Sequence, residues 1–285
     1  MRGAIDIGSN SIRLAISNGT VESNITKLAD GLSGGFLSPA GVEKTISVLS
    51  DYVATCKKIG CTDIYAFATE AVRKAADGKA FAARVLSECG LTVHILTEKQ
   101  EAELALLGAD KPDGAATVCD LGGGSMEVVC AKDGKTPSYA KSLPLGVVVM
   151  KNRFNGDYRK AIDEMPALVA EYGALPSYPV TISGGSACAI AAALLNLKVY
   201  DKARVTARFS ARELDDAMPL LLSDKLSVFR PVCRKRRDTI PYGAIVIQAL
   251  LNHAGAGEFY VSDSGNLEAV LRTPKFFGNA DAKIQ

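Results

Sequence analysis

Apolar and polar residues alternate in short segments at the start of the chain. Residues 3–7, 12–17 and 21–28 each read as a short strand, and the turn residues between them favour a β-meander. From residue 38 to residue 58 the apolar positions recur with a helical period instead, after a Ser-Pro pair that is typical of a helix N-terminus. The pattern therefore predicts three strands followed by a long helix.

Strand and helix patterns then alternate along the chain. Residues 63–77 and residues 91–109 each read as a strand, a turn and a helix. This alternation predicts an α/β sheet with crossover helices. Glycine, proline and aspartate accumulate at 108–116, which indicates a domain boundary there. We expect one domain over residues 1–114 and a second over residues 115–285, whose last helix could pack back on the first domain.

The opening pattern returns after this boundary. The segment DIGSNS at 6–11 matches the segment DLGGGS at 120–125 without a gap, and both continue into alternating apolar strands. The second half then gives a strand, a glycine turn and a helix at 181–197, and a helix, a strand and a turn at 240–271. This internal repetition predicts two copies of one supersecondary plan.

The two repeated turns have the composition of a phosphate cradle. Glycine between paired strands can be purely structural, because tight hairpins need a positive φ. Both turns, however, also carry an aspartate just before the glycine and a serine within the turn. Consecutive amides form an anion-binding nest, serine adds a hydroxyl donor, and aspartate can hold a metal ion against phosphate oxygens. The predicted phosphate-binding residues are Ser9, Asn10, Ser11, Gly122, Gly123, Gly124 and Ser125.

Composition narrows the class of protein. The chain has 285 residues, is 48% hydrophobic and carries a net charge of +2, which does not indicate a nucleic-acid-binding or membrane protein. The first strand begins almost at Met1, so we expect no signal peptide. Seven cysteines without a C-x-x-C pair predict reduced thiols in the cytoplasm. His94 and His253 lack the spacing of metal ligands.

The motifs resemble those of a known family. The segments AIDIGSNSIRLAI, FATEAVRKAAD, LTEKQEAELALLGA and CDLGGGSMEVV are similar, in order and spacing, to the exopolyphosphatase and guanosine pentaphosphate phosphohydrolase family. The later segments ISGGSACAIAA and RDTIPYGAIVI are similar as well. The resemblance implies two actin-like, ribonuclease H-like α/β domains with the active site in an interdomain cleft. The length resembles that of the short, two-domain members.

The resemblance also implies roles for two side chains of the first half. Glu101, in KQEAEL, stands at the position of the family's proposed catalytic base. Without the resemblance, Glu101 reads as a solvated glutamate in the first turns of a helix. The chain departs from the family pattern at Gln100, where an acid is usual, and at Glu103, where arginine is common. Arg73 matches the arginine that contacts the phosphate chain.

In the family, two carboxylates of the second glycine turn lie at the metal site. They correspond to Asp120, just before the turn, and Glu127, on the strand after it, and we add Asp6 from the first turn. Without the resemblance, Glu127 reads as a strand residue that faces outward. The expected cofactor is Mg²⁺ or another divalent cation such as Mn²⁺. Gly184 and Gly185 match a third glycine turn, which can equally be a helix-capping turn.

The sequence leaves the roles of two basic features undecided. Arg13 follows the first turn on a strand and has no assigned role. The run RKRR at 234–237 is either a solvated face or a cluster that steers an anionic substrate.

The leading functional prediction is hydrolysis of terminal phosphate from inorganic polyphosphate. The alternative within the family is hydrolysis of pppGpp to ppGpp. A kinase or ATPase of the same superfamily is a different class, but GGSACAIA at 184–191 lacks the basic residue of an adenosine pocket. A non-catalytic binder of polyphosphate or a nucleotide is a third class. We expect neither nucleic acid nor membrane partners, and the resemblance allows a homodimer.

Overall fold

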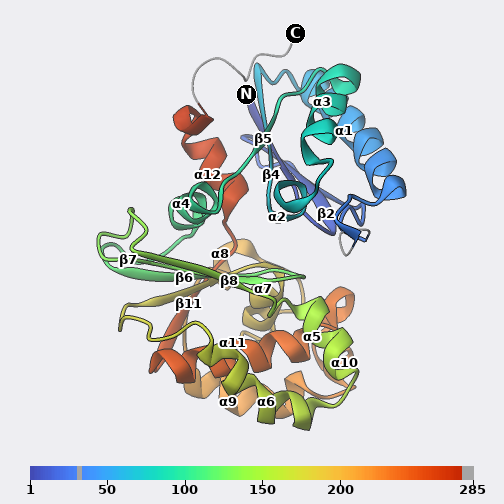
Figure 1. The fold of residues 1–285 in the computed structure, drawn as a ribbon. Coiled ribbons are helices and arrows are strands. Elements are labelled where there is room, and N and C mark those ends of the chain that lie inside the picture. Colours follow the sequence, from blue (N-terminus) through green and yellow to red (C-terminus); the bar gives the residue numbers. More distant parts are fainter. Residues whose placement is uncertain (31–33, 278–285) are drawn as a thin grey trace. The chain divides into compact units, whose positions relative to one another are not determined.

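The computed structural model describes residues 1–30 and 34–277 (Figure 1). Residues 278–285, the end of the predicted second domain, lie outside the described residues. Among the described residues, no helix combines the length and the hydropathy needed to cross a bilayer.

The chain forms two compact units, and each has its own sheet. The first unit comprises Met1–Leu104 and the segment that begins at Asn266, and the second unit comprises Ala105–Gly265. The predicted α/β class with two related domains is confirmed, because each unit combines a mixed sheet with crossover helices.

The sheet of the first unit has five strands in the order β3-β2-β1-β4-β5. The three N-terminal strands form the predicted antiparallel meander, and β4 and β5 continue the sheet parallel to β1. The strands are β1 (Arg2–Ile7), β2 (Ser11–Ile16), β3 (Val21–Ile25), β4 (Asp63–Ala68) and β5 (Val93–Ile95). The helices are α1 (Pro39–Ile59), α2 (Glu70–Lys74), α3 (Gly78–Cys89), the start of α4 (Glu98–Gly108), α12 (Asn266–Arg272) and the 3-10 helix η3 (Pro274–Phe277).

Both faces of this first sheet are covered, which explains the apolar character of β1. Side chains of successive strand residues point to opposite faces. Ile5 therefore packs into the core shared with α1 and α3, whereas Ala4 packs into the core shared with Leu267 of α12. Figure 1 shows α1 and α3 on one side of the sheet and α12 on the other. The last described α-helix contacts β1 and β2, so the C-terminal segment completes the first unit.

Helix α1 begins and ends where its sequence predicts. The Ser38 side chain accepts a hydrogen bond from the Gly41 amide at 3.2 Å, and Pro39 occupies the first turn, where its missing N–H costs nothing. At the other end, Gly60 has φ 83°, the left-handed conformation that glycine adopts without strain.

The sheet of the second unit has six strands in the order β10-β11-β9-β6-β7-β8. They are β6 (Ala116–Leu121), β7 (Met126–Ala131), β8 (Tyr139–Leu143), β9 (Val180–Ser183), β10 (Arg208–Ser210) and β11 (Glu258–Ser262). The helices are α5 (Val147–Phe154), α6 (Tyr158–Ala170), α7 (Gly185–Leu194), α8 (Lys202–Val205), α9 (Ala211–Leu221), α10 (Leu226–Phe229), the 3-10 helix η2 (Pro231–Arg236) and α11 (Ile240–Ala254).

The second sheet repeats the first. An antiparallel meander of β6, β7 and β8 is again extended by strands parallel to its first strand, here β9 and β11. The added strand β10 pairs antiparallel with β11 at the edge. The duplicated plan predicted from 6–11 and 120–125 is therefore present in the topology.

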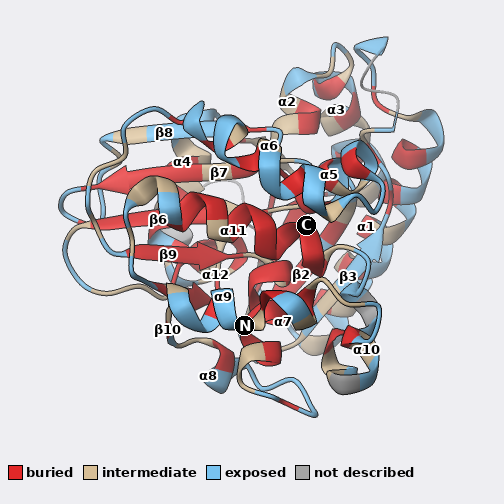
Figure 2. Cartoon of the chain, turned by 90° about the horizontal axis from the view of Figure 1, so that it is seen from below, coloured by how far each residue is buried: buried red, intermediate tan, exposed pale blue. Residues whose placement is uncertain are grey.

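One large core lies between this sheet and its helices, and α11 is buried along most of its length (Figure 2). Ile245, Ile247 and Leu250 each expose 2% or less of their surface. Burying a side chain of this size contributes roughly 1.5–3 kcal/mol. The helix therefore fixes the layer of helices that supports the strand ends on which the candidate site is built.

Candidate active site

In the first unit, three parallel strands end at one edge of the sheet. Ile7 of β1 pairs with Ala68 of β4, and Ala68 pairs with Ile95 of β5. The first glycine turn follows β1, Arg73 lies on the helix after β4, and Glu101 lies on the helix after β5. The carboxyl ends of parallel strands are the usual ligand-binding edge of α/β sheets. The structure thus gathers the predicted residues of this unit at one edge.

Arg73 and Glu101 contact each other directly at this edge. Arg73 Nη1 donates to Glu101 Oε2 at 2.8 Å and to the carbonyl of Leu96 at 2.9 Å. The two side chains are only 22% and 18% exposed. Glu101 is therefore held by a specific partner, unlike the solvated helix glutamate that composition alone would suggest.

The start of α4 explains the departure at Gln100. The Gln100 side chain accepts a hydrogen bond from the Thr97 amide at 3.0 Å, and Thr97 Oγ1 accepts one from the Gln100 amide at 3.2 Å. This reciprocal pair is a capping box, which satisfies two amides of the helix terminus. An uncharged glutamine thus fixes the helix that carries Glu101. At the second departure, the Glu103 carboxylate forms a long ion pair, with 4.0 Å between Glu103 Oε1 and Lys99 Nζ.

The first glycine turn is flanked by an acid and a base whose charges cancel. The Gly8 amide donates to the carbonyl of Ser11 at 3.0 Å, which closes the turn. Asp6 and Arg13 are directly paired on β1 and β2, and their side chains form an ion pair of 2.6 Å. Arg13, which the sequence left without a role, thus binds the Asp6 carboxylate. A metal-binding role of Asp6 stays a prediction, and it would require competition with this guanidinium.

The second glycine turn has the same backbone but a different charge. The Gly122 amide donates to the carbonyl of Ser125, again at 3.0 Å. Asp120 is paired with Glu127 on the neighbouring strand, at the position where the first turn has arginine. Two like charges directly opposite each other destabilise a sheet. This pair is therefore the better candidate for a divalent cation.

The carbonyls of the first turn accept hydrogen bonds from amides of the segment that follows β3. The amide of Ala29 donates to Ser9 O at 2.9 Å, and the amides of Thr26 and Lys27 donate to Asn10 O at 3.0 Å. In a trans peptide the C=O and the next N–H point in opposite directions. The N–H groups of Asn10 and Ser11 therefore face away from that segment.

The second turn is built in the same way on α5. Its carbonyls accept hydrogen bonds from the first amides of that helix: Val147 N to Gly122 O at 3.0 Å and Val148 N to Gly123 O at 2.9 Å. The amides that follow these carbonyls in the turn point to the opposite side. Within the described part of the chain, the N–H groups of Gly123 and Gly124 donate to no backbone carbonyl. Such a row of amides is the anion-binding nest that the composition predicts.

Gly146, which sequence reasoning did not select, makes this second nest possible. It precedes α5, and a Cβ at this position would lie 2.3 Å from the Gly124 carbonyl carbon and 2.4 Å from Gly123 O. A glycine directly before an apolar run was the only sequence signal.

Replacing Gly146 by alanine is expected to lower the free energy of unfolding by roughly 1–3 kcal/mol, because the turn backbone must move. Urea unfolding measures this loss. Gly257→Ala is the matched control, since a Cβ there would meet no atom within 4 Å. Equal stability of the two variants would contradict the close packing of Gly146 on the turn.

The third glycine turn lies beside Asp120. Gly184 has φ 106° and precedes α7, and a Cβ there would lie 2.4 Å from Leu121 O and 3.4 Å from Asp120 Oδ1. Gly185 lies under the guanidinium of Arg236, whose Nη2 would be 2.3 Å from an added Cβ. Arg236, one residue of the run 234–237, therefore packs against Gly185, which is predicted from the sequence to be a site residue. Steering by the rest of the run stays a prediction, and the side chain of Lys235 lies outside the described residues.

A buried thiol lies in the first turn of α7. Cys188 Sγ is 3.4 Å from Asp263 Oδ1. Burial raises the pKa of the Cys188 thiol to about 12, so the neutral thiol persists at physiological pH. We therefore assign it no nucleophilic role. All seven cysteines are free thiols, as predicted.

The carboxylates of the second turn fit a magnesium ion. In the part of the chain that the structure describes, no group of three or more His, Cys, Asp or Glu side chains is placed to hold a metal. Mg²⁺, however, is usually bound by one or two carboxylates together with substrate phosphates. Asp120 and Glu127 supply two carboxylates on adjacent strands, so the residues present fit this cation.

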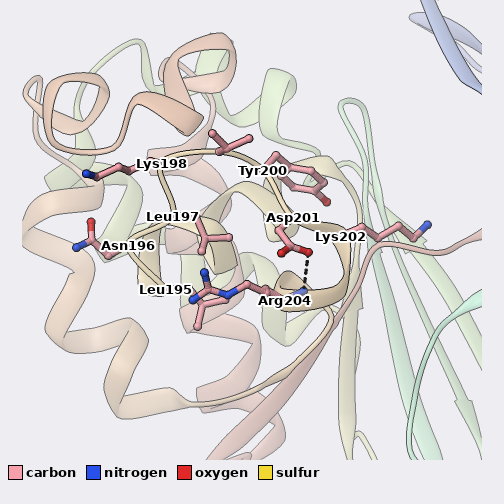
Figure 3. A pocket seen from close by; sticks show the side chains of 9 residues that line it. Leu195, Asn196, Leu197, Lys198, Tyr200, Asp201, Lys202 and Arg204 are labelled. Atoms are coloured by element: carbon pink, nitrogen blue, oxygen red, sulfur yellow. Dashed lines mark hydrogen bonds between the residues drawn. The ribbon is translucent and has the colours of Figure 1, made fainter.

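A separate surface pocket of about 770 Å³ lies in the loop after α7 (Figure 3). It is lined by residues 195–202 and Arg204, and the Asp201 side chain accepts hydrogen bonds from the amides of Ala203 and Arg204. None of the predicted site residues lines this pocket. Its charged side chains are exposed, and Asp201 caps α8.

Comparison with known proteins identifies the family. Residues 16–272 match the sequence profile of the Ppx/GppA phosphatase family. The chain belongs to the Ppx/GppA family. Exopolyphosphatase 2 of Mycobacterium tuberculosis is 26% identical over 308 aligned residues, which cover 94% of this chain and 96% of that protein. Exopolyphosphatase 1 of Mycobacterium bovis is 31% identical over 158 residues, which are 50% of this chain and 46% of that protein, so the match spans about half of this relative.

Solved structures of the Ppx/GppA family share the fold. A family member from Aquifex aeolicus superposes with a TM-score of 0.81 at 28% identity, covering 96% of both chains. A type II variant of the Ppx/GppA phosphatase from the same organism gives a TM-score of 0.82 at 27% identity, covering 96% of this chain and 99% of that one. The resemblance inferred from the motifs is thereby confirmed at the level of family and fold.

Proposed function

We propose that the protein is a metal-dependent exopolyphosphatase that removes terminal orthophosphate from inorganic polyphosphate. The observation that carries this proposal is the duplicated turn, whose carbonyls are occupied and whose amides face the other way. A nest of amides suits the oxygens of a phosphoryl group, and each of the two units carries one such turn. The family and its relatives named as exopolyphosphatases support the same reaction class.

The chemistry follows from the groups at the two sheet edges. Hydrolysis forms a bond between a water oxygen and the terminal phosphorus, and breaks the bond from that phosphorus to the bridging oxygen, which leaves with the electron pair. Glu101 orients the water and accepts its proton. Arg73 holds Glu101, and its five N–H donors suffice to contact the phosphate as well.

We propose Mg²⁺ as the cation, with Asp120 and Glu127 as its protein ligands. When bound, the cation neutralises charge that develops on the phosphate oxygens. The amides of the turns donate hydrogen bonds to the same kind of oxygen and need no reorganisation during the reaction. Arg236 adds a guanidinium at the third turn, where the sequence of α7 itself offers no basic residue.

We also propose that the protein works in the reducing environment of the cytoplasm, which its seven free thiols fit. Homodimer formation, which the resemblance implies, stays a prediction that light scattering would test.

A substrate panel tests the proposed function. The protein is incubated with Mg²⁺ and medium-length polyphosphate, pppGpp, or ATP with glucose or glycerol, and released phosphate and ADP are measured. We expect phosphate release from polyphosphate. Release from pppGpp alone would favour the guanosine pentaphosphate alternative at the same site, and sugar-dependent ADP formation would overturn the hydrolase proposal in favour of a kinase. Binding without turnover of any substrate would indicate a non-catalytic binder.

A further inference from the structure

A row of polar side chains crosses the second sheet at the level of the two metal-site carboxylates. Strand pairing places Ser142 of β8 opposite Glu127, Glu127 opposite Asp120, and Asp120 opposite Ser183 of β9. Directly paired residues of neighbouring strands point to the same face. The two acids are therefore flanked by a serine on either side.

Each serine donates a hydrogen bond to the acid beside it. Ser142 Oγ donates to Glu127 Oε1 at 2.7 Å, and Ser125 Oγ donates to the same oxygen at 2.5 Å. On the other side, Ser183 Oγ donates to Asp120 Oδ1 at 3.0 Å. Hydrogen bonds from hydroxyl groups to carboxylates are charge-assisted and fix the orientation of the acceptor.

These contacts matter because the two carboxylates repel each other. Because like charges lie directly opposite each other on the two strands, each acid gains by rotating away from its neighbour, which would separate the ligands of a cation. A hydroxyl bound to one oxygen of each acid opposes that rotation. Partners of metal ligands typically change metal affinity 10–100-fold when they are removed.

We propose that Ser142 and Ser183 are positioning residues that hold Glu127 and Asp120 in the orientation required by the divalent cation. The inference rests on the proposed metal dependence, and it assigns a role to two serines that the sequence patterns did not select. The two serines lie on different strands and contact different acids, so they can be tested separately. Ser142 is exposed on its strand, and Ser183 is 5% exposed. A purely structural role would alter stability and leave metal affinity unchanged.

The test is calorimetric titration of the substrate-free protein with Mn²⁺. Ser142→Val and Ser142→Thr have the same shape and differ in the hydroxyl, so we expect Ser142→Val to bind roughly 10-fold more weakly and Ser142→Thr to bind like the wild type. Ser183→Ala is expected to lose affinity to a similar degree. Its control is Thr181→Val on the same face of β9, because the Thr181 hydroxyl has no hydrogen-bond partner among the described residues.

The outcomes separate the two proposals. If the wild type binds no Mn²⁺, or binds it equally well after Asp120→Asn, the proposed metal site is wrong. If Asp120→Asn removes binding but Ser142→Val and Ser183→Ala bind like the wild type, the metal site stands and the positioning role is overturned. Equal losses in Ser142→Val and Ser142→Thr would assign the effect to side-chain bulk and also overturn it. Thermal unfolding of each variant confirms that folded protein is titrated.

Discussion

Replacing Glu101 by glutamine is expected to lower the rate of phosphate release from polyphosphate by roughly 10²- to 10⁴-fold, the contribution typical of a general base. Glutamine keeps the size of the side chain and an oxygen that can accept the hydrogen bond from Arg73, which is 2.8 Å long in the acid. Substrate binding should therefore persist. Steady-state kinetics should show the loss in kcat, and filter binding should show retained polyphosphate affinity.

A matched control lies three residues earlier on the same helix. Glu98 is an exposed acid in the first turn of α4, where it interacts favourably with the helix dipole. Glu98→Gln should change stability by only a few tenths of a kcal/mol and leave kcat as it is. If Glu101→Gln retains wild-type kcat, Glu101 is a structural partner of Arg73 and another group activates water.

Replacing Asp120 by asparagine is expected to lower turnover in Mg²⁺ by roughly 10²- to 10³-fold, because several kcal/mol of charge stabilisation depend on the cation. The loss should lessen as Mg²⁺ is raised, since the variant weakens binding of the ion. A Mg²⁺ titration of the initial rate measures this shift.

Asp113→Asn is the control for this experiment. It removes the same charge from an exposed position just before β6. Its Mg²⁺ dependence should match that of the wild type. An Asp120→Asn variant with an unchanged Mg²⁺ dependence would contradict the assignment of Asp120 as a ligand.

The local elements of the first unit follow from the sequence because their signals are local. The meander of β1, β2 and β3 is indicated by three short strand-like segments separated by turn residues, and α1 is indicated by Ser38 and Pro39 at its start. The duplicated turn was also predictable, since its residues are contiguous in each copy.

The remaining features depend on contacts between distant segments. The packing of Gly146 on the second turn, the position of Arg236 over Gly185 and the pairing of Arg13 with Asp6 all require the register and the crossovers of the folded chain. Helices α8 and α10 have four residues each, which is too short to give a periodic signal.

The two turns differ in the charge that lies opposite the aspartate. Both copies kept the aspartate and the backbone, yet one has Arg13 opposite the acid and the other has Glu127. The acid of the first turn therefore faces a positive charge on the neighbouring strand, whereas the acid of the second turn faces a second acid. A single cation at the second turn would balance the charges of the pair.

A crystal structure of the protein with Mn²⁺ and a non-hydrolysable diphosphonate tests the central claim most directly. We expect an anomalous manganese peak at coordination distance from Asp120 and Glu127, with phosphonate oxygens accepting hydrogen bonds from the amides of Gly123 and Gly124. A diphosphonate that binds elsewhere, for example at the surface loop 195–204, together with no manganese at Asp120, would contradict the account.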